Sequence, residues 1–168
     1  MRRRDRVILR AAIPAFALRV ALGVAAAAGA LLVPVAGWQV AAVVLGALAA
    51  LRPATRLSYL VVPIIALGLF LTGPDAGRTA LALFLVHAIH TLTSITALLG
   101  ADALISLRAL RPLALRFAVI QLGAQAVAAA LLLMPAGGVA WLAPVGALAL
   151  AGVAAVFLVV PRGRARGA

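Results

Sequence analysis

The sequence predicts an all-α fold, a polytopic bundle of six transmembrane helices, and two observations support this prediction. Hydrophobic residues make up 67% of the 168 residues, and the mean hydropathy is +1.24. A soluble domain is only about half apolar, so the solvent around this chain should be lipid. The second observation is charge: the 15 basic residues, all arginines, fall in short clusters between apolar stretches, as in the cytoplasmic loops of membrane proteins.

The composition also excludes several kinds of function. Only three acidic residues oppose the arginines, and the net charge is +12. Because the arginines lie beside apolar stretches, we expect them to contact anionic membrane lipids and not nucleic acid, at roughly 1 kcal/mol per arginine near the surface. The chain has no cysteine, which excludes disulfides and cysteine metal sites. Arginine without lysine, amid much Ala, Gly, Val and Leu, suggests a GC-rich bacterial genome.

The chain is expected to begin and end in the cytoplasm. Residues 1–12 form a basic segment, residues 13–160 the helical bundle, and residues 161–168 a basic tail. Arginines interrupt the first apolar run, so a juxtamembrane segment is favoured over a signal peptide. The first span is expected from Ile13 to Leu32, with Arg19 inside its cytoplasmic end and reaching back to the lipid headgroups.

The second span, Val40 to Leu51, is short for a membrane crossing and leaves open an incomplete or re-entrant element. Trp38, just before it, suits a membrane interface. Ala42, Gly46 and Ala50 recur every four residues, and such a row of small side chains would let another helix approach closely.

The third span, Leu57 to Thr72, follows a basic loop that contains Arg52 and Arg56. Pro63 lies inside this span, where a missing backbone N–H is expected to kink the helix. The fourth span, Arg78 to Gly100, carries both histidines of the chain.

The second half of the chain carries fewer signals. In residues 102–116, leucines recur every three positions among arginines, which predicts a short helix at the cytoplasmic surface. The fifth span is expected from Phe117 to Met134, and the sixth from Leu142 to Val160.

Six spans place both termini and every arginine cluster on one side, and leave only Asp75 and Arg78 on the other. This bias predicts cytoplasmic termini in a bacterial inner membrane. Removing one whole hairpin preserves the bias, so four spans is the alternative. The three outer turns share a Pro-x-x-Gly pattern at Pro34, Pro74 and Pro135. This suggests three repeated hairpins, unless proline and glycine simply fill short turns.

One polar constellation within the spans could carry chemistry. Three polar side chains of the fourth span share a helical face at spacings of three and four residues, and two glutamines of the fifth span are four residues apart. Lipid offers such groups no hydrogen bonds, so these side chains are expected to hydrogen-bond to one another. The polar intramembrane cluster comprises His87, His90, Thr91, Ser94, Gln121 and Gln125.

A rise of about 1.5 Å per residue, counted from Arg78 and from Arg116, predicts the pairing within this cluster. It places His90 near mid-membrane and facing Gln125, with Ser94 facing Gln121. Three interpretations are open: interhelical hydrogen bonds that hold the bundle together, a proton or ion path with histidine as the titrating group, or a metal site on the two histidines. A transition metal usually requires three or four ligands, and the chain has no cysteine or glutamate that could complete the coordination shell.

The sequence carries no enzyme signature and implies no catalytic residue, cofactor or metal. We therefore expect a non-catalytic accessory or scaffold subunit that acts through contacts with other membrane subunits or with itself. The alternative is a small transporter or channel that uses the polar stripe of the fourth span, and a third, weaker option is an enzyme acting on lipid. Six arginines are expected to contact lipid headgroups: Arg19, Arg52, Arg56, Arg108, Arg111 and Arg116.

Overall fold

The computed structural model describes residues 12–55, 57–73, 75–100 and 102–133. The chain divides into two compact units, residues 1–129 and 130–168, and the contacts reported below lie within the first unit. The described residues are mostly helical, which confirms the all-α prediction. Their helices are α1 (Ala15–Ala30), α2 (Ala36–Leu51), α3 (Val61–Thr72), α4 (Ala76–Thr96) and α5 (Leu107–Leu132), with 3₁₀ turns η1 (Pro53–Thr55) and η2 (Leu57–Leu60).

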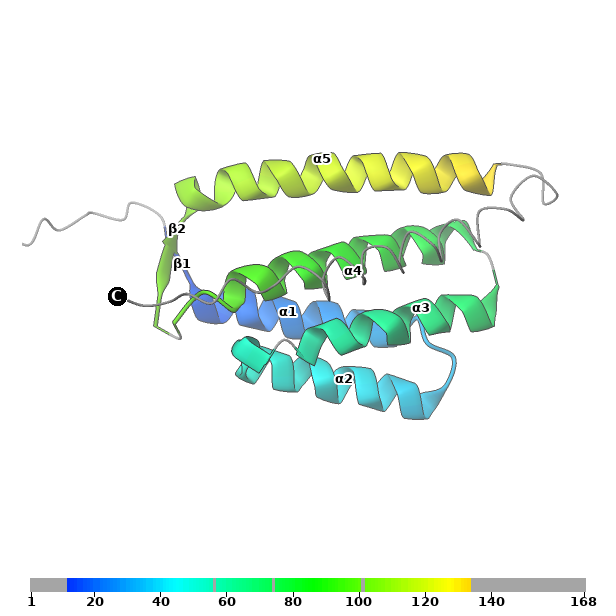
Figure 1. Cartoon of the computed structure of the whole chain (residues 1–168), viewed down its shortest axis with the longest axis horizontal. Coiled ribbons are helices and arrows are strands. Elements are labelled where there is room, and N and C mark those ends of the chain that lie inside the picture. The colour runs from blue at the N-terminus through cyan, green and yellow to red at the C-terminus, as the bar shows by residue number, and fades with distance from the viewer. Residues whose placement is uncertain (1–11, 56, 74, 101, 134–168) are drawn as a thin grey trace, which may run out of the picture. The chain divides into compact units, whose positions relative to one another are not determined.

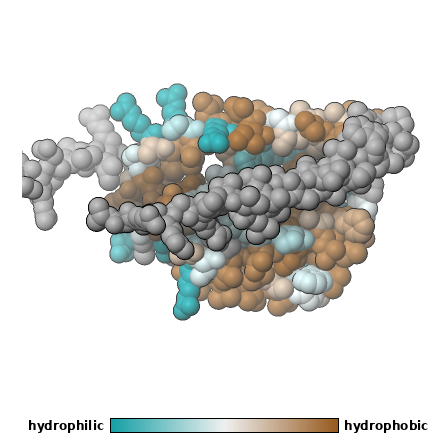
Figure 2. All heavy atoms as spheres, in the orientation of Figure 1, coloured by the Kyte–Doolittle hydropathy of each residue, from teal (hydrophilic) through white to brown (hydrophobic). Residues whose placement is uncertain are grey.

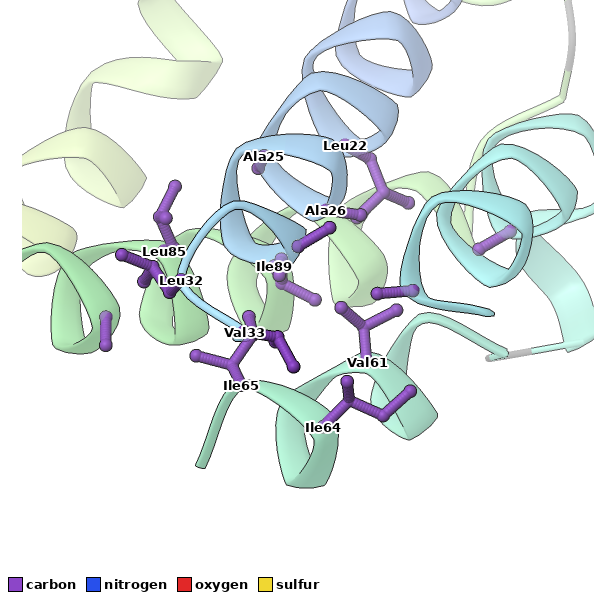
Figure 3. Packing of buried hydrophobic residues seen from close by; sticks show 14 residues of the cluster. Leu22, Ala25, Ala26, Leu32, Val33, Val61, Ile64, Ile65, Leu85 and Ile89 are labelled. Atoms are coloured by element: carbon purple, nitrogen blue, oxygen red, sulfur yellow. The ribbon is translucent and has the colours of Figure 1, made fainter. Parts of the chain in front are cut away.

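Successive helices of the first unit run in opposite directions, and α1 packs against α2, α3 and α4 (Figure 1). The core between them is apolar and draws on all four helices (Figure 3). Leu22 and Ala26 of α1 meet Ile65 of α3 and Ile89 of α4, and each of these side chains is 0% exposed. No described residue of α5 belongs to this core. The buried apolar packing therefore holds α1 to α4 together, and α5 must be held by other contacts.

The row of small residues in α2 forms the contact with α1. Ala42 and Gly46 are buried, and Ala50 lies 3.6 Å from the position that a Cβ on Gly23 would occupy. A Cβ on Gly46 would collide with the Cβ of Ala26. The prediction that these small side chains admit a close neighbour is confirmed, since the two backbones approach where side chains are smallest.

Six spans were expected, and five helices lie in the part of the chain that the structure describes. Of these, α4 with 21 residues and α5 with 26 are long and apolar enough to cross a membrane. The helices α1 and α2 have 16 residues each, and η2 continues into α3 over 57–72. The predicted sixth span, 142–160, and the two basic terminal segments, apart from Ala12, lie outside the described residues.

The proline of the third predicted span sits near a helix start. α3 begins at Val61, so Pro63 lies in its first turn, where a missing N–H leaves no hydrogen bond unmade. The preceding residues, Leu57–Leu60, form a 3₁₀ turn that leads into α3. The irregularity expected at Pro63 is thus a change from 3₁₀ to α geometry just before it.

The predicted surface helix over 102–116 is wrong as a separate element, because residues 107–116 are helical but form the start of α5. Leu104–Ser106 form a strand, β2, that pairs antiparallel with β1, Ala12–Pro14, with Ile13 opposite Ile105. The strand pairing satisfies backbone groups that a helix would have used internally. α5 then starts at Leu107, because the Ser106 hydroxyl accepts a hydrogen bond of 3.2 Å from the N–H of Ala109 and caps the helix. The arginines of this stretch therefore lie on α5 itself.

A helix begins shortly after each of the first two prolines of the Pro-x-x-Gly pattern. α2 begins two residues after Pro34, and α4 begins at Ala76, two residues after the second proline. At the second turn the Asp75 carboxylate accepts a hydrogen bond of 2.7 Å from the N–H of Arg78, which caps α4. The third turn, at Pro135, lies outside the described residues, so the hairpin repeat stays a prediction.

Candidate functional site

Two glutamines of α5 make its hydrogen bonds to α4. Oε1 of Gln121 lies 3.0 Å from Nδ1 of His87, and Gln121 is the only buried residue among those described in α5. Nε2 of Gln125 donates to the carbonyl of Ala80 at 2.7 Å. The expected adjacency of these two helices is therefore observed. We call the line along which α4 faces α5 the seam.

The predicted pairing within the seam is wrong. His90 does not face Gln125, and Ser94 does not face Gln121. Gln121 meets His87, about two helical turns from its expected partner, and Gln125 meets Ala80, nearly three turns from its own. The prediction placed the start of the fifth span at Arg116, but the helix starts nine residues earlier, at Leu107. Because depth was counted from a residue inside the helix, both predicted partners on α4 lie too close to its C-terminal end.

Aromatic rings also join α4 and α5 beside the hydrogen bond between His87 and Gln121. The ring of Phe117 stacks on His87 with centroids 4.4 Å apart and an interplanar angle of 19°. Phe84 meets Phe117 edge to face at 5.8 Å. The imidazole of His87 is thus fixed by a hydrogen bond at one side and by a ring against its face. Neither phenylalanine was among the residues predicted for this site, although Phe84 precedes His87 by three residues and so shares its side of the helix.

The remaining residues of the polar stripe on α4, His90 and Ser94, face Tyr59 in the 3₁₀ turn η2 that precedes α3. The ring of Tyr59 lies 5.6 Å from that of His90, and the Tyr59 hydroxyl is 3.4 Å from Oγ of Ser94. Ser94 also donates to the carbonyl of His90 at 2.9 Å, which places its hydroxyl against its own helix. His90 and Ser94 are exposed in the described part of the chain, so their polar atoms remain accessible.

A buried hydroxyl pair nearby was not anticipated. Oγ of Ser58 and Oγ1 of Thr93 lie 2.6 Å apart, and both side chains are fully buried. Thr93 donates its own proton to the carbonyl of Ile89 at 2.6 Å, so Ser58 is the donor within the pair. The spacing of Thr93 is a signal for this pair in the sequence. Thr93 lies four residues after the apolar Ile89, so the two side chains share one face of α4, and both are buried, whereas Ser94 is exposed.

Among the described residues, two neighbouring hollows open along the seam, and a third of about 440 Å³ lies where Tyr59 of η2 faces His90 of α4 and Ile120 of α5. The polar hollow, of about 240 Å³, is lined by five polar side chains, His87, His90, Thr91, Ser94 and Arg116, together with Ile95, Leu113, Phe117 and Ile120. The apolar hollow, of about 310 Å³, is lined by Ala88, Leu92, Leu110 and Ala114 together with Thr91, Ile95, Leu113 and Phe117. Because four lining residues belong to both, the two hollows are neighbours.

The chemistry of the polar hollow is that of hydrogen-bond donors. A guanidinium, two imidazoles and two hydroxyls line it, and no carboxylate does. Asp75 caps the far end of α4. Within the described residues, no three His, Cys, Asp or Glu side chains gather where they could hold a metal ion. The arrangement is suited to an anionic group.

Two arginines make reciprocal contacts between the antiparallel helices α1 and α4. Arg19, in the first half of α1, donates to the carbonyl of Leu99, just beyond the end of α4, at 3.1 Å. Arg78, in the first turn of α4, donates to the carbonyl of Leu32, just beyond the end of α1. Each guanidinium thereby meets the negative end of the partner helix. Arg19, expected to reach lipid headgroups, is half-buried and engaged with the protein.

The remaining predicted arginines that the structure describes are exposed. They lie in the part of the first unit where α1 and α5 begin and α2 and α4 end (Figure 1), and Arg116 lies furthest inward, nine residues after the start of α5. We call this the arginine-rich end. Asp75 and Arg78 lie at the opposite end. Arg56 lies outside the described residues, and the exposed arginines are Arg52, Arg108, Arg111 and Arg116.

These observations define an all-α protein with two exposed apolar helices and a polar seam between them. No protein family, no curated protein and no solved structure matches the chain. Any function must therefore be argued from the seam and from the outer surface of the helices.

Proposed function

We propose that the protein is a multi-span integral membrane protein that acts without catalysis, as a scaffold or accessory subunit bound to other membrane helices. The observation that carries this proposal is the outer surface of α5. Its most apolar 18-residue window is only 6% buried. Leu115, Leu122 and Val127 are 66%, 71% and 61% exposed. Such a continuous apolar surface is costly in water and favourable against lipid or another apolar helix.

Exposure of the other helices supports a membrane location. A core helix of a soluble protein is mostly buried, whereas the apolar window of α4 is 28% buried. Phe16 and Val24 of α1 are 67% and 63% exposed, and Phe70 of α3 is 83% exposed. Helices of 16 residues reach about 24 Å, so α1 and α2 would cross a bilayer of about 30 Å with local thinning.

The distribution of charge supports an orientation. Hydrophilic surface gathers toward the arginine-rich end, and apolar surface covers most of the rest of the visible face (Figure 2). The positive-inside bias places that end in the cytoplasm of a bacterial inner membrane. The proposed topology also includes a sixth span and two cytoplasmic termini.

The use of the polar groups supports a scaffold over a catalyst. His87 and Gln125 make hydrogen bonds to the neighbouring helix, and Ser58 and Thr93 bond to each other. Interhelical hydrogen bonds of this kind are worth about 0.6 kcal/mol on average in a membrane, so they fix which helices pair more than they stabilise the bundle. The outward face of α5 is then available to a partner.

Fractionation and cross-linking test the proposal. We expect the full chain to stay in the membrane pellet after alkaline carbonate extraction. Since the chain has no cysteine, Leu122→Cys places one thiol on the exposed face of α5, and Ala42→Cys places a matched thiol in the buried α1–α2 contact. Cross-linking in intact membranes should join Leu122→Cys to a partner or a second copy, and leave Ala42→Cys unlinked. Release by carbonate, or equal cross-linking of the two variants, would contradict the proposal.

A second candidate is a small transporter or channel, and the polar hollow beside His87 and His90 is the observation that favours it. The double variant His87→Ala, His90→Ala separates the two functions. Loss of solute flux in vesicles with normal assembly would favour transport. Loss of assembly or of a cross-linked partner, with no change of flux, would favour the scaffold.

A further inference from the structure

Among the described residues, Arg116 is the exposed arginine that lines the polar hollow. It comes from α5 and lines the hollow together with His90 and Ser94 of α4. In the part of the chain that the structure describes, no carboxylate lies within salt-bridge distance of Arg116. A guanidinium is always charged and is suited to phosphate oxygens, which it binds with two parallel N–H groups. The site therefore favours a singly or doubly charged anion.

The apolar hollow indicates what the anion is attached to. It lies beside the polar hollow and shares with it the side chains of Thr91, Ile95 and Leu113. Beyond these it is lined by Leu92 and Ala114 and presents almost no polar atoms. A small inorganic anion would leave this space without a partner, whereas an alkyl chain joined to the anion would fill it.

The level of the hollow along α4 fits a headgroup. α4 ends at Thr96, so Ser94 and His90 lie roughly 3 Å and 9 Å from its end, and Arg116 lies roughly 14 Å from the start of α5, at about 1.5 Å per residue. The hollow therefore extends inward from that end of the two helices. That end is the arginine-rich end. In a bilayer, an anionic phosphate sits at the boundary of the hydrocarbon, and its acyl chains run inward along the helices.

We propose that the seam between α4 and α5 is a binding site for an anionic phospholipid. The headgroup phosphate occupies the polar hollow and accepts hydrogen bonds from Arg116, with the His90 and Ser94 side chains beside it. One acyl chain lies in the apolar hollow against Leu113 and Ala114. The site rests on the membrane location proposed above, and it deepens that proposal by naming the lipid class that joins the two helices.

The test uses the purified full chain in detergent micelles and measures bound lipid by native mass spectrometry. Phosphatidylglycerol and phosphatidylcholine with the same acyl chains are offered in equal amounts. We expect the wild type to retain phosphatidylglycerol preferentially. Arg116→Gln should reduce that retention roughly tenfold, since hydrogen bonds to charged groups are worth about 1.5 kcal/mol or more. Leu115→Gln, at the exposed neighbouring position that lines neither hollow, is the matched control and should bind as the wild type does.

A second variant tests the apolar half of the site. Ala114 is exposed and lines the apolar hollow, so Ala114→Phe should fill that space without disturbing the α1–α4 core. We expect it to reduce retention of phosphatidylglycerol severalfold while circular dichroism stays unchanged. Glycerol phosphate, the soluble headgroup alone, should not displace the lipid at millimolar concentration.

Four outcomes would overturn the lipid site: equal retention of the two lipids, wild-type binding by Arg116→Gln, an equal loss in Leu115→Gln, or displacement by glycerol phosphate, which would indicate a site for a free phosphate. These failures differ from failure of the membrane proposal. A chain that needs detergent for solubility but shows no lipid preference contradicts the lipid site alone, and a chain soluble without detergent contradicts the membrane location.

Discussion

Gly46→Ala is the substitution that most directly tests the close packing of α2 on α1. A Cβ at Gly46 would collide with the Cβ of Ala26. Both atoms are attached directly to helical backbones, so no side-chain rotation relieves the collision and the two helices must separate. Inserting a methyl group into a packed contact costs about 1–3 kcal/mol, and a collision between backbone-attached atoms belongs at the upper end. The gain in helix propensity from glycine to alanine returns about 1 kcal/mol.

The net destabilisation is therefore about 2 kcal/mol, which corresponds to a fall in Tm of about 4–8 °C for a chain of this size. Thermal unfolding in detergent, followed by circular dichroism at 222 nm, measures it. Gly37→Ala is the matched control, because Gly37 lies in the same helix and a Cβ there meets nothing within 4 Å. The control should leave Tm unchanged or raise it slightly. A Gly46→Ala variant at least as stable as Gly37→Ala would refute the packing of α1 on α2 described above.

Three further predictions concern polar contacts and are measured by the same unfolding assay. Arg78→Ala removes the guanidinium from the carbonyl at the end of α1 and should cost about 2 kcal/mol, whereas Arg52→Ala, at an exposed position, should cost almost nothing. Ser58→Ala removes the hydroxyl that donates to the buried Thr93 hydroxyl and should cost about 1 kcal/mol. Gln121→Leu removes the hydrogen-bond partner of His87 and should cost about 0.6 kcal/mol. It should also speed amide hydrogen exchange in α5, while α1 to α4 stay protected.

Each of these predictions can fail separately. Equal effects of Arg78→Ala and Arg52→Ala would show that the reciprocal contact between α1 and α4 contributes nothing. A Ser58→Ala variant as stable as the wild type would contradict the buried hydroxyl pair. Uniform loss of exchange protection over all helices in Gln121→Leu would show that α5 belongs to the same cooperative core as α1 to α4.

Composition and local pattern predicted the helical class and two of the contacts between helices, but not the register of those contacts. The small residues Ala42, Gly46 and Ala50 marked the face of α2 that packs on α1, because only small side chains permit that approach. The adjacency of α4 and α5 followed from the need of polar groups for partners in an apolar setting. Both inferences depend on chemistry local to one helix, which a sequence displays.

The failures concern register and pairing between distant segments. Residues 104–106 form a strand because residues 12–14 lie beside them, and nothing within residues 102–116 alone specifies that partner. The same error displaced the start of α5, and with it the pairing of His90 and Ser94 across the seam. The reciprocal contacts of Arg19 and Arg78 depend on the antiparallel packing of α1 on α4, which a count of spans does not determine.

The central claim, that the helices cross a membrane with the arginine-rich end in the cytoplasm, is tested most directly by the accessibility of single cysteines. Ala54 and Ala76 are exposed residues at opposite ends of the first unit, and the chain has no cysteine of its own. In intact spheroplasts, a membrane-impermeant maleimide should label Ala76→Cys at once and Ala54→Cys only after the membrane is permeabilised. Labelling of both positions from the same side of the intact membrane would contradict the account.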